Sequence, residues 1–165
     1  MDSFFLGGAT LVLAPPSQKG PVRVNGLVII DNTWANYNMP HNTTVVIDER
    51  RQKFTQPPLD MVMLGNIGDG RMAPRAITVT RSLYMAKSTQ WVFDFSDVFL
   101  FPSVPIVEAT YSITTEEGCA WARHTLRPPK GQTVTVETDV HVSATVTVTA
   151  TQGEFSVGNR GGLRG

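Results

Sequence analysis

The fold class is decided by the stretch from Gln132 to Thr151, which reads QTVTVETDVHVSATVTVTAT. Apolar residues occupy every second position over most of this stretch, and threonine or serine fills most positions between them. A period of two is typical of strands with one buried face, and the stiff Val and Thr side chains favour a pleated sheet over a helix. Thr138 and Asp139 interrupt the apolar set, which predicts two strands with a bend or turn near Glu137 to Asp139.

The rest of the chain predicts further short strands separated by turns. Pro15-Pro16, Glu117-Gly118 and Pro128-Pro129 are among the turn signals. No segment has a sustained helical period, so we expect helix to be nearly absent. Many short strands at this spacing indicate an all-β sandwich or barrel. The expected strands cover residues 22–30, 43–48, 61–64, 76–84, 91–95, 106–114 and 119–126.

The chain divides into four parts by composition. Residues 1–14 are an N-terminal arm or strand, 15–86 an irregular β region, 87–151 a regular β-sandwich and 152–165 a Gly-rich C-terminal arm. The boundary falls at Met85 to Ser88, with one continuous sheet through it as the alternative. An arm or strand that contacts neighbouring subunits is expected to use apolar and basic residues at the two ends of the chain. These residues are Phe4, Phe5, Leu6, Arg160, Leu163 and Arg164.

Charge and cysteine content restrict the partners of the chain. The formal net charge is +0, so no overall field attracts nucleic acid or anionic lipid. No segment is apolar over the length needed to span a bilayer, and Met1 to Leu6 lacks the positive start of a signal peptide. Cys119 is the single cysteine, which excludes an intramolecular disulfide and a cysteine-based metal site. We expect no nucleic-acid partner, no membrane partner and no metal.

Residues that could support catalysis are scattered. His41, His124 and His141 have no nucleophile or acid at motif spacing. The run from Gly65 to Gly70 lacks the Gly-Lys-Ser/Thr ending of a phosphate-binding loop, so it predicts a turn. We therefore predict that the chain is not an enzyme and binds no cofactor.

One loop has the residue types of a sugar-binding site. Trp34, Asn36 and Tyr37 lie in an Asn-rich segment, and exposed aromatic faces beside amides suit a saccharide. The competing interpretation, which we favour, places Trp34 in the core or in a subunit contact. The three residues are nevertheless the candidate contacts for a glycan or a partner.

The second half resembles a known family over residues 87–152. The motifs are WVFDFS at 91–96, PIVEATY at 105–111 and ATVTVTATQG at 144–153. They are similar to small immunoglobulin-like β-sandwich modules of tailed-bacteriophage structural proteins. A weaker resemblance is to H-type lectin sandwiches. The first resemblance implies an immunoglobulin-like sandwich with extended terminal arms, which acts by adhesion to neighbouring subunits.

These observations lead to one functional prediction and one alternative. The prediction is a bacteriophage virion protein at the capsid surface, the neck or collar, or the tail or fibre. Its partners would be other virion proteins and further copies of itself, and it would assemble in the host cytoplasm. The alternative is a carbohydrate- or receptor-binding β-sandwich, with a host surface glycan as ligand.

Overall fold

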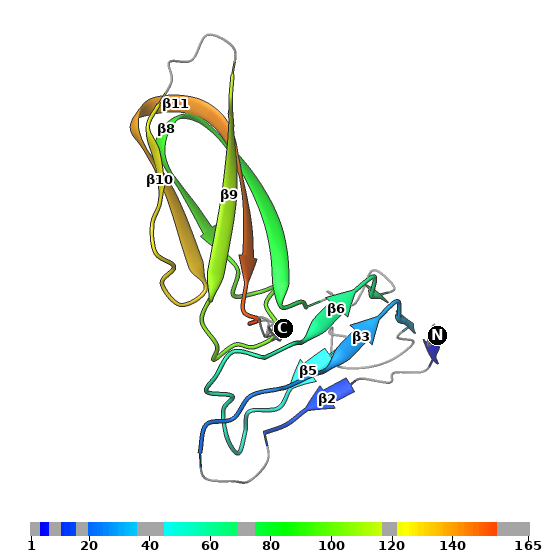
Figure 1. Ribbon diagram of the computed structural model, residues 1–165. Helices are drawn as coiled ribbons and strands as arrows, with labels where there is room; N and C mark the ends of the chain where they lie inside the picture. The colour runs from blue at the N-terminus through cyan, green and yellow to red at the C-terminus, as the bar shows by residue number, and fades with distance from the viewer. Residues whose placement is uncertain are drawn as a thin grey trace, which may run out of the picture.

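The predicted all-β class is confirmed. The computed structural model describes residues 4–6, 11–15, 20–35, 45–68, 75–116 and 122–154, and of 4–6, 34–35 and 67–68 it describes the backbone. These residues form strands and no helix. Figure 1 shows two regions, a set of short strands near the N-terminus and a taller, folded sheet made of longer strands.

The first region consists of short strands stacked in parallel. Leu11 lies beside Val45, Val28 beside Val62 and Thr33 beside Ile67. In each pair the partners are 34 residues apart, as they are in the Asn32–Asn66 contact. The backbone therefore completes one coil in about this length and stacks the next coil on it, as in a β-solenoid. The first coil contains β1 (Phe4–Leu6), β2 (Leu11–Leu13) and β3 (Val28–Ile30), the second contains β4 (Thr33–Ala35), β5 (Val45–Ile47) and β6 (Val62–Leu64), and β7 (Ile67–Gly68) follows.

Equivalent turns hold the two coils together. Asp31 and Gly65 follow β3 and β6, and both have positive φ, 53° and 62°. A side chain at Gly65 would collide with the Asp31 carboxylate, since a Cβ there would lie 1.9 Å from Asp31 Oδ1. The next residue in each turn is an asparagine, and Asn32 Nδ2 donates to Asn66 Oδ1 over 3.1 Å. Asn66 Nδ2 donates in turn to the carbonyl of Ile29 over 2.8 Å.

The second region is one antiparallel sheet folded back on itself. Its strands are β8 (Thr78–Asp94), β9 (Glu108–Thr115), β10 (His124–Leu126) and β11 (Thr133–Thr151). β8 and β11 pair along most of their length, and both curve over at the end far from the coils (Figure 1). Register shifts between Glu137 and Ala144 mark the bend, where Lys87 has a φ of 50°. β9 extends the arm of β11 that ends at Thr151, and β10 extends the other arm.

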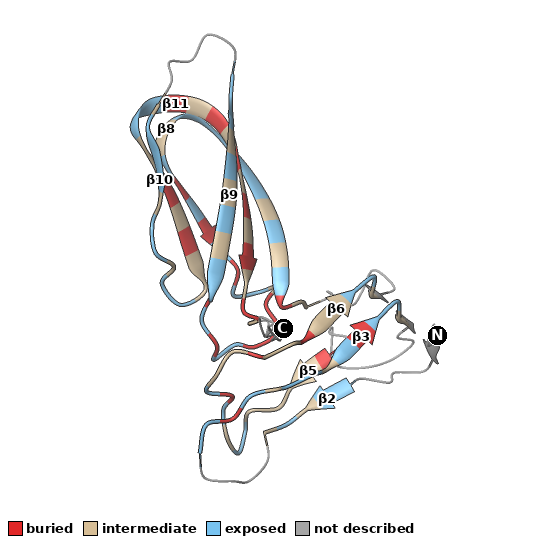
Figure 2. Cartoon of the chain, in the orientation of Figure 1, coloured by how far each residue is buried: buried red, intermediate tan, exposed pale blue. Residues whose placement is uncertain are grey.

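The folded sheet encloses its own hydrophobic core. Buried and partly exposed positions alternate along β11, as the period of two predicted (Figure 2). Trp91 and Phe93 come from the arm of β8 that follows the bend, Phe95 follows that strand directly, and Val146 and Val148 come from the opposite arm of β11. All five side chains are at most 4% exposed. One open side of the fold is bridged by Arg81, which binds the Asp97 carboxylate over 2.8 Å and lies over the Phe95 ring.

Gln152 joins the folded sheet to the coils. Its side chain is fully buried directly after β11. The amide nitrogen donates to the carbonyls of Phe101 and Val104 over 2.7 and 2.6 Å, and the amide oxygen accepts from the Phe101 backbone over 3.1 Å. Leu100, Phe101 and Val104 belong to the core of the coils, where Phe101 meets the Phe54 ring edge-on. One side chain thus fixes the segment that covers the second coil.

Two expectations differ from the structure in detail, and one open alternative is decided. The boundary expected at Met85 to Ser88 falls inside β8, because the strand bends there without ending, and the change from coils to antiparallel sheet lies near Ala76. β11 is likewise one bent strand and not two. Residues 4–6 and 11–13, which the sequence left open between an arm and a strand, are strands paired within this chain. Arg160, Leu163 and Arg164 lie outside the described residues.

We predict that Gln152→Ala lowers the free energy of unfolding by about 2–4 kcal/mol, because the buried Phe101 N–H loses its acceptor and the carbonyls of Phe101 and Val104 lose their closest donor. Urea denaturation followed by tryptophan fluorescence measures the change. Gln132→Ala is the matched control, since the Gln132 amide donates to the same carbonyls from a less buried position. Equal losses for the two variants would contradict a special role for Gln152.

Candidate functional site

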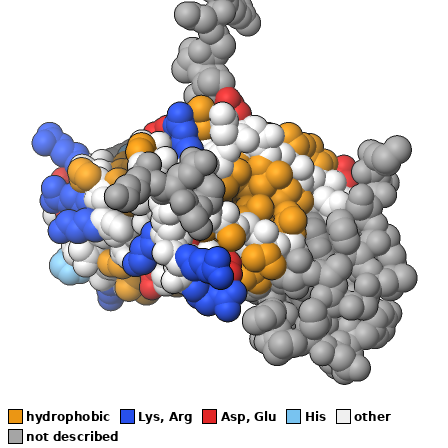
Figure 3. Space-filling model, turned by 90° about the horizontal axis from the view of Figure 1, so that it is seen from below, with side chains coloured by type: hydrophobic (Ala, Val, Ile, Leu, Met, Phe, Trp, Pro, Cys, Tyr) orange, Lys and Arg blue, Asp and Glu red, His pale blue; other side chains and the backbone are white. Residues whose placement is uncertain are grey.

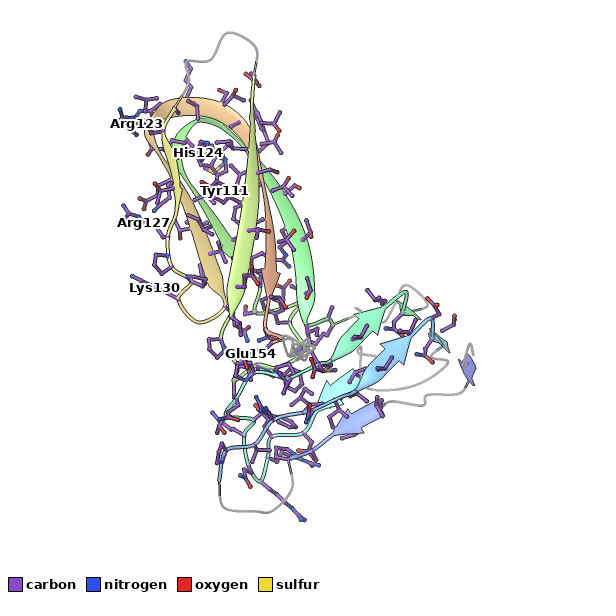
Figure 4. The ribbon with its side chains drawn as sticks, viewed as in Figure 1. Tyr111, Arg123, His124, Arg127, Lys130 and Glu154 are labelled. Atoms are coloured by element: carbon purple, nitrogen blue, oxygen red, sulfur yellow. The ribbon has the colours of Figure 1, made fainter. Side chains whose placement is uncertain are left out.

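Basic side chains line one edge of the folded sheet. Arg123 precedes β10, Arg127 follows it, and Lys130 lies in the turn before β11. Figure 4 shows the three side chains spaced along the β10 edge and directed away from the sheet. All three residues are exposed. Two carboxylates lie beside these three cations, because Glu137 pairs with Arg127 and Asp139 accepts from the Arg123 backbone N–H.

A hollow of about 460 Å³ opens at the lower end of this edge. The turn from Arg127 to Lys130 forms one wall with two cations and two proline rings, and Thr133 and Thr135 of β11 contribute hydroxyl groups. Lys130 and Thr133 exchange backbone hydrogen bonds of 3.0 and 3.1 Å, and Gly131 allows this tight turn with a φ of 60°. The wall that carries Lys130 is therefore fixed by its backbone.

The Arg127 guanidinium is held in place by Glu137. Arg127 Nε donates to Glu137 Oε2 over 2.7 Å, and an amino group of the same guanidinium lies 2.6 Å from that oxygen. The Arg127 side chain lowers the pKa of the Glu137 carboxyl, and a contact from Gln90 acts in the same direction. A guanidinium has five N–H donors, so this ion pair leaves donors for a ligand. The arrangement presents an oriented cation at the mouth of the hollow.

His124 and Tyr111 close the side of the folded sheet next to the basic edge. Tyr111 on β9 and His124 on β10 share a hydrogen bond of 2.7 Å between the phenol oxygen and Nδ1. Their rings meet edge-on with centroids 5.5 Å apart. Figure 4 shows the pair between the two strands, which come from opposite arms of the fold. His124, which the sequence placed in a strand without a catalytic partner, thus links the two layers.

A second hollow, of about 220 Å³, lies on the outer face of the opposite arm. Its lining is Thr78, Thr110, Thr149, Thr151 and the carboxylate of Glu108. Hydroxyl pairs cross from β8 to β11 beside it, with 2.9 Å between Thr78 and Thr151 Oγ1. The two hollows differ in charge, because one carries two cations and the other a carboxylate.

The candidate glycan residues lie outside the side chains that the structure describes. Trp34 lies in β4 between β1 and β7, and its side chain is not described. Asn36 and Tyr37 lie outside the described residues. Arg127 and Lys130 were not predicted as site residues from the sequence. The signal for them is Arg-Pro-Pro-Lys-Gly at 127–131, which places one cation on each side of a pair of prolines.

Two further kinds of site are absent from the part of the chain that the structure describes. No group of three or more His, Cys, Asp and Glu side chains in the described ranges is arranged to hold a metal ion. Within the same ranges, no helix has the length and apolar character needed to cross a membrane.

Comparison with known proteins gives one informative similarity. Over 152 residues, which is 92% of this chain, the sequence is 32% identical to polygalacturonase QRT3 of Arabidopsis thaliana. The chain spans 30% of the length of that protein. No protein-family profile matches the chain, and no solved structure matches it.

The prediction of a bacteriophage virion protein is wrong. The similarity to a polygalacturonase runs through both the coils and the folded sheet, whereas the phage resemblance rested on three short motifs in the second half. Those motifs consist of alternating Val, Thr and aromatic residues, which any antiparallel sheet with one buried face favours. The associated expectations of a capsid, neck or tail role are withdrawn with it.

We predict that Arg127→Ala raises the pKa of the Glu137 carboxyl toward its ordinary value, because the neighbouring positive charge and its hydrogen bonds are lost. Carboxyl-detected NMR titration measures this pKa directly. Because the folded-state pKa of Glu137 is lowered, the pair contributes stability above the unfolded pKa of that group, and the contribution is lost as the pH falls through the folded pKa. Arg123→Ala is the control, and an equal shift there would show that long-range charge, and not the direct pair, sets the pKa.

Proposed function

We propose that this chain is a polygalacturonate-binding region of a polygalacturonase-like protein, with the hollow between Arg127 and Lys130 as its binding site. The observation that carries the proposal is this hollow, which offers cations, hydroxyls and apolar rings together. The similarity to polygalacturonase QRT3 supplies the class of ligand.

The chemistry of the hollow suits an acidic polysaccharide. Polygalacturonate carries a carboxylate on each sugar, and a guanidinium matches a carboxylate with two parallel hydrogen bonds, while an ammonium acts as a point charge. Thr133 and Thr135 provide hydroxyls that donate to or accept from sugar hydroxyls. Pro128 and Pro129 provide apolar surface for the carbon-bound hydrogens of a sugar ring.

The openness of the site suits a polymer that extends beyond it. The hollow lies beside β10, and Arg123 continues the positive charge along the same edge (Figure 4). A chain of uronate units crossing the hollow can therefore meet cations at more than one point. Exposed ion pairs are screened by salt, so binding by this site weakens as ionic strength rises.

Two earlier expectations remain proposals. One is that the chain itself is not an enzyme, which fits a site that holds an acidic ligand through fixed cations. The other is that the folded sheet of β8 to β11 is an immunoglobulin-like sandwich, which the two facing arms around Trp91 and Val146 support.

We predict that the chain binds oligomers of galacturonate and that Arg127→Ala with Lys130→Ala weakens binding about tenfold, which corresponds to about 1.4 kcal/mol. Isothermal titration calorimetry at low and high salt measures the affinity and its screening. Arg51→Ala with Lys53→Ala is the control, because it removes the same charge from the coil region.

The same samples test the absence of catalysis. Release of reducing ends from polygalacturonate is expected to stay at the level of buffer alone. Equal affinity for the site variant and the control, or absence of binding by the wild-type chain, would contradict the proposed site.

A further inference from the structure

The outer face of one arm of the folded sheet consists of rows of hydroxyl groups. In this arm β11 lies between β8 and β9, and Thr149 is opposite Thr80 on one side and Thr110 on the other. Residues that lie opposite one another on neighbouring strands share a face of the sheet. Three such rows follow one another, and we call them the hydroxyl face. Its residues are Thr78, Thr151 and Glu108 in the first row, Thr80, Thr149 and Thr110 in the second, and Ser82, Thr147 and Ser112 in the third.

The hydroxyl groups of β8 and β11 on this face hold one another in place. In the three rows their oxygen atoms lie 2.9, 2.8 and 2.7 Å apart. A hydroxyl group has one donor and two acceptor positions, so each pair keeps positions for a ligand. Side chains that are already ordered on paired strands lose little conformational entropy when a ligand binds. The hydroxyl face is therefore prepared to form several hydrogen bonds with one ligand.

The preference of threonine for strands does not account for this face. The same two long strands form the other arm, where the outward positions carry charges of both signs, at Asp94, Glu137 and Arg127. In the three rows of the hydroxyl face, Glu108 is the one charged residue. Exposed apolar side chains gather at the coil end of the molecule, which Figure 3 shows from below Figure 1. The hydroxyl face thus suits a ligand that is itself rich in hydroxyl groups.

A carboxylate lies at each end of the hydroxyl face. Glu108 lines the hollow of about 220 Å³ together with four threonines. Beyond the third row, Tyr84 lies opposite Thr145 and is 51% exposed, and its phenol donates to the Glu116 carboxylate over 2.7 Å. From Thr78 to Tyr84 the strand rises about 20 Å, at about 3.4 Å per residue. Carboxylates accept from sugar hydroxyls, and an exposed aromatic ring packs against the carbon-bound hydrogens of a sugar.

We propose that the hydroxyl face binds a neutral glycan chain, with one sugar ring in the hollow beside Glu108 and further sugars extending toward Tyr84. The rows of hydroxyls pair with the sugar hydroxyls, and the two carboxylates repel a chain of uronates. The basic hollow between Arg127 and Lys130 has the opposite preference and lies on the other arm. The two sites therefore select sugars of different charge, and this inference does not rest on the proposed function.

The test is titration of the full chain with cellohexaose, mannohexaose and xylohexaose, followed by NMR of the threonine methyl groups. We expect at least one of these neutral hexasaccharides to shift the signals of Thr110 and Thr149 and to leave those of Thr133 and Thr135 unchanged. Thr110→Val with Thr149→Val keeps the shape of both side chains and removes two hydroxyls from the lining of the hollow. This variant is expected to bind the same hexasaccharide at least about tenfold more weakly. Unchanged near-ultraviolet circular dichroism and melting temperature show that it is folded.

Thr125→Val with Thr138→Val is the matched control in the other arm. Thr125 is exposed as Thr110 is, and Thr138 is partly buried with one side-chain hydrogen bond, as Thr149 is. The control is expected to bind as the wild type does. Absence of shifts with all three hexasaccharides would overturn the proposal, as would shifts centred on the basic hollow or equal affinities for the two variants. The variant that lacks both cations of the basic hollow is expected to keep its affinity for the neutral glycan, so the two proposals fail separately.

Discussion

The buried amide of Gln152 is the constraint on which the two regions depend. It lies directly after β11, where the folded sheet ends, but its partners are backbone groups of the segment that completes the core of the coils. Burying an amide is costly unless its donors and acceptor are paired. The Gln152 side chain can therefore be buried at the end of β11 only when the segment of residues 101–104 is in place. The same segment covers the second coil, which would otherwise end in an open hydrophobic face. The coils and the folded sheet are therefore stabilised as one unit.

The regularity of the hydrophobic pattern in each strand decided how much of the fold could be predicted from the sequence. The alternation from Gln132 to Thr151 predicted the strand character and the buried face of β11 correctly, because a period of two in Val and Thr is typical of a half-buried strand. It did not predict that β11 is one bent strand, since Thr138 and Asp139 indicated a break between two strands. The coils were missed as coils, because strands of three residues carry almost no periodic signal of their own. Their signal lies in the 34-residue offset, which aligns Val28-Ile29-Ile30 with Val62-Met63-Leu64 and Asn32 with Asn66. A search for internal repeats addresses this pattern directly.

The site was harder to predict than the fold. A basic site is predicted most easily from cations that follow one another in the sequence. Arg127 and Lys130 do not, because the two prolines that shape the turn separate them. The aromatic loop at Trp34 had the residue types of a sugar site, yet nothing in the sequence fixed where its side chains would point. The prediction of a virion protein failed for a related reason, because strand motifs report a buried face and carry little information on what the other face binds.

The length of β8 and β11 has a consequence for how the chain reaches its native state. The pairing that joins Thr78 to Thr151 closes a separation of 73 residues, whereas stacking one coil on the next closes 34. Closing a longer loop costs more conformational entropy before any contact compensates it, and topologies dominated by distant pairings fold slowly. The most local pairing in the sheet is that of β10 with β11, where Leu126 lies opposite Val136, and the pairing of β8 with the end of β11 is the most distant. We therefore expect the β8–β11 pairing to form last. Until β11 is complete, the Gln152 amide cannot bind the carbonyls of Phe101 and Val104, so the contact between the two regions is expected to be among the last to form.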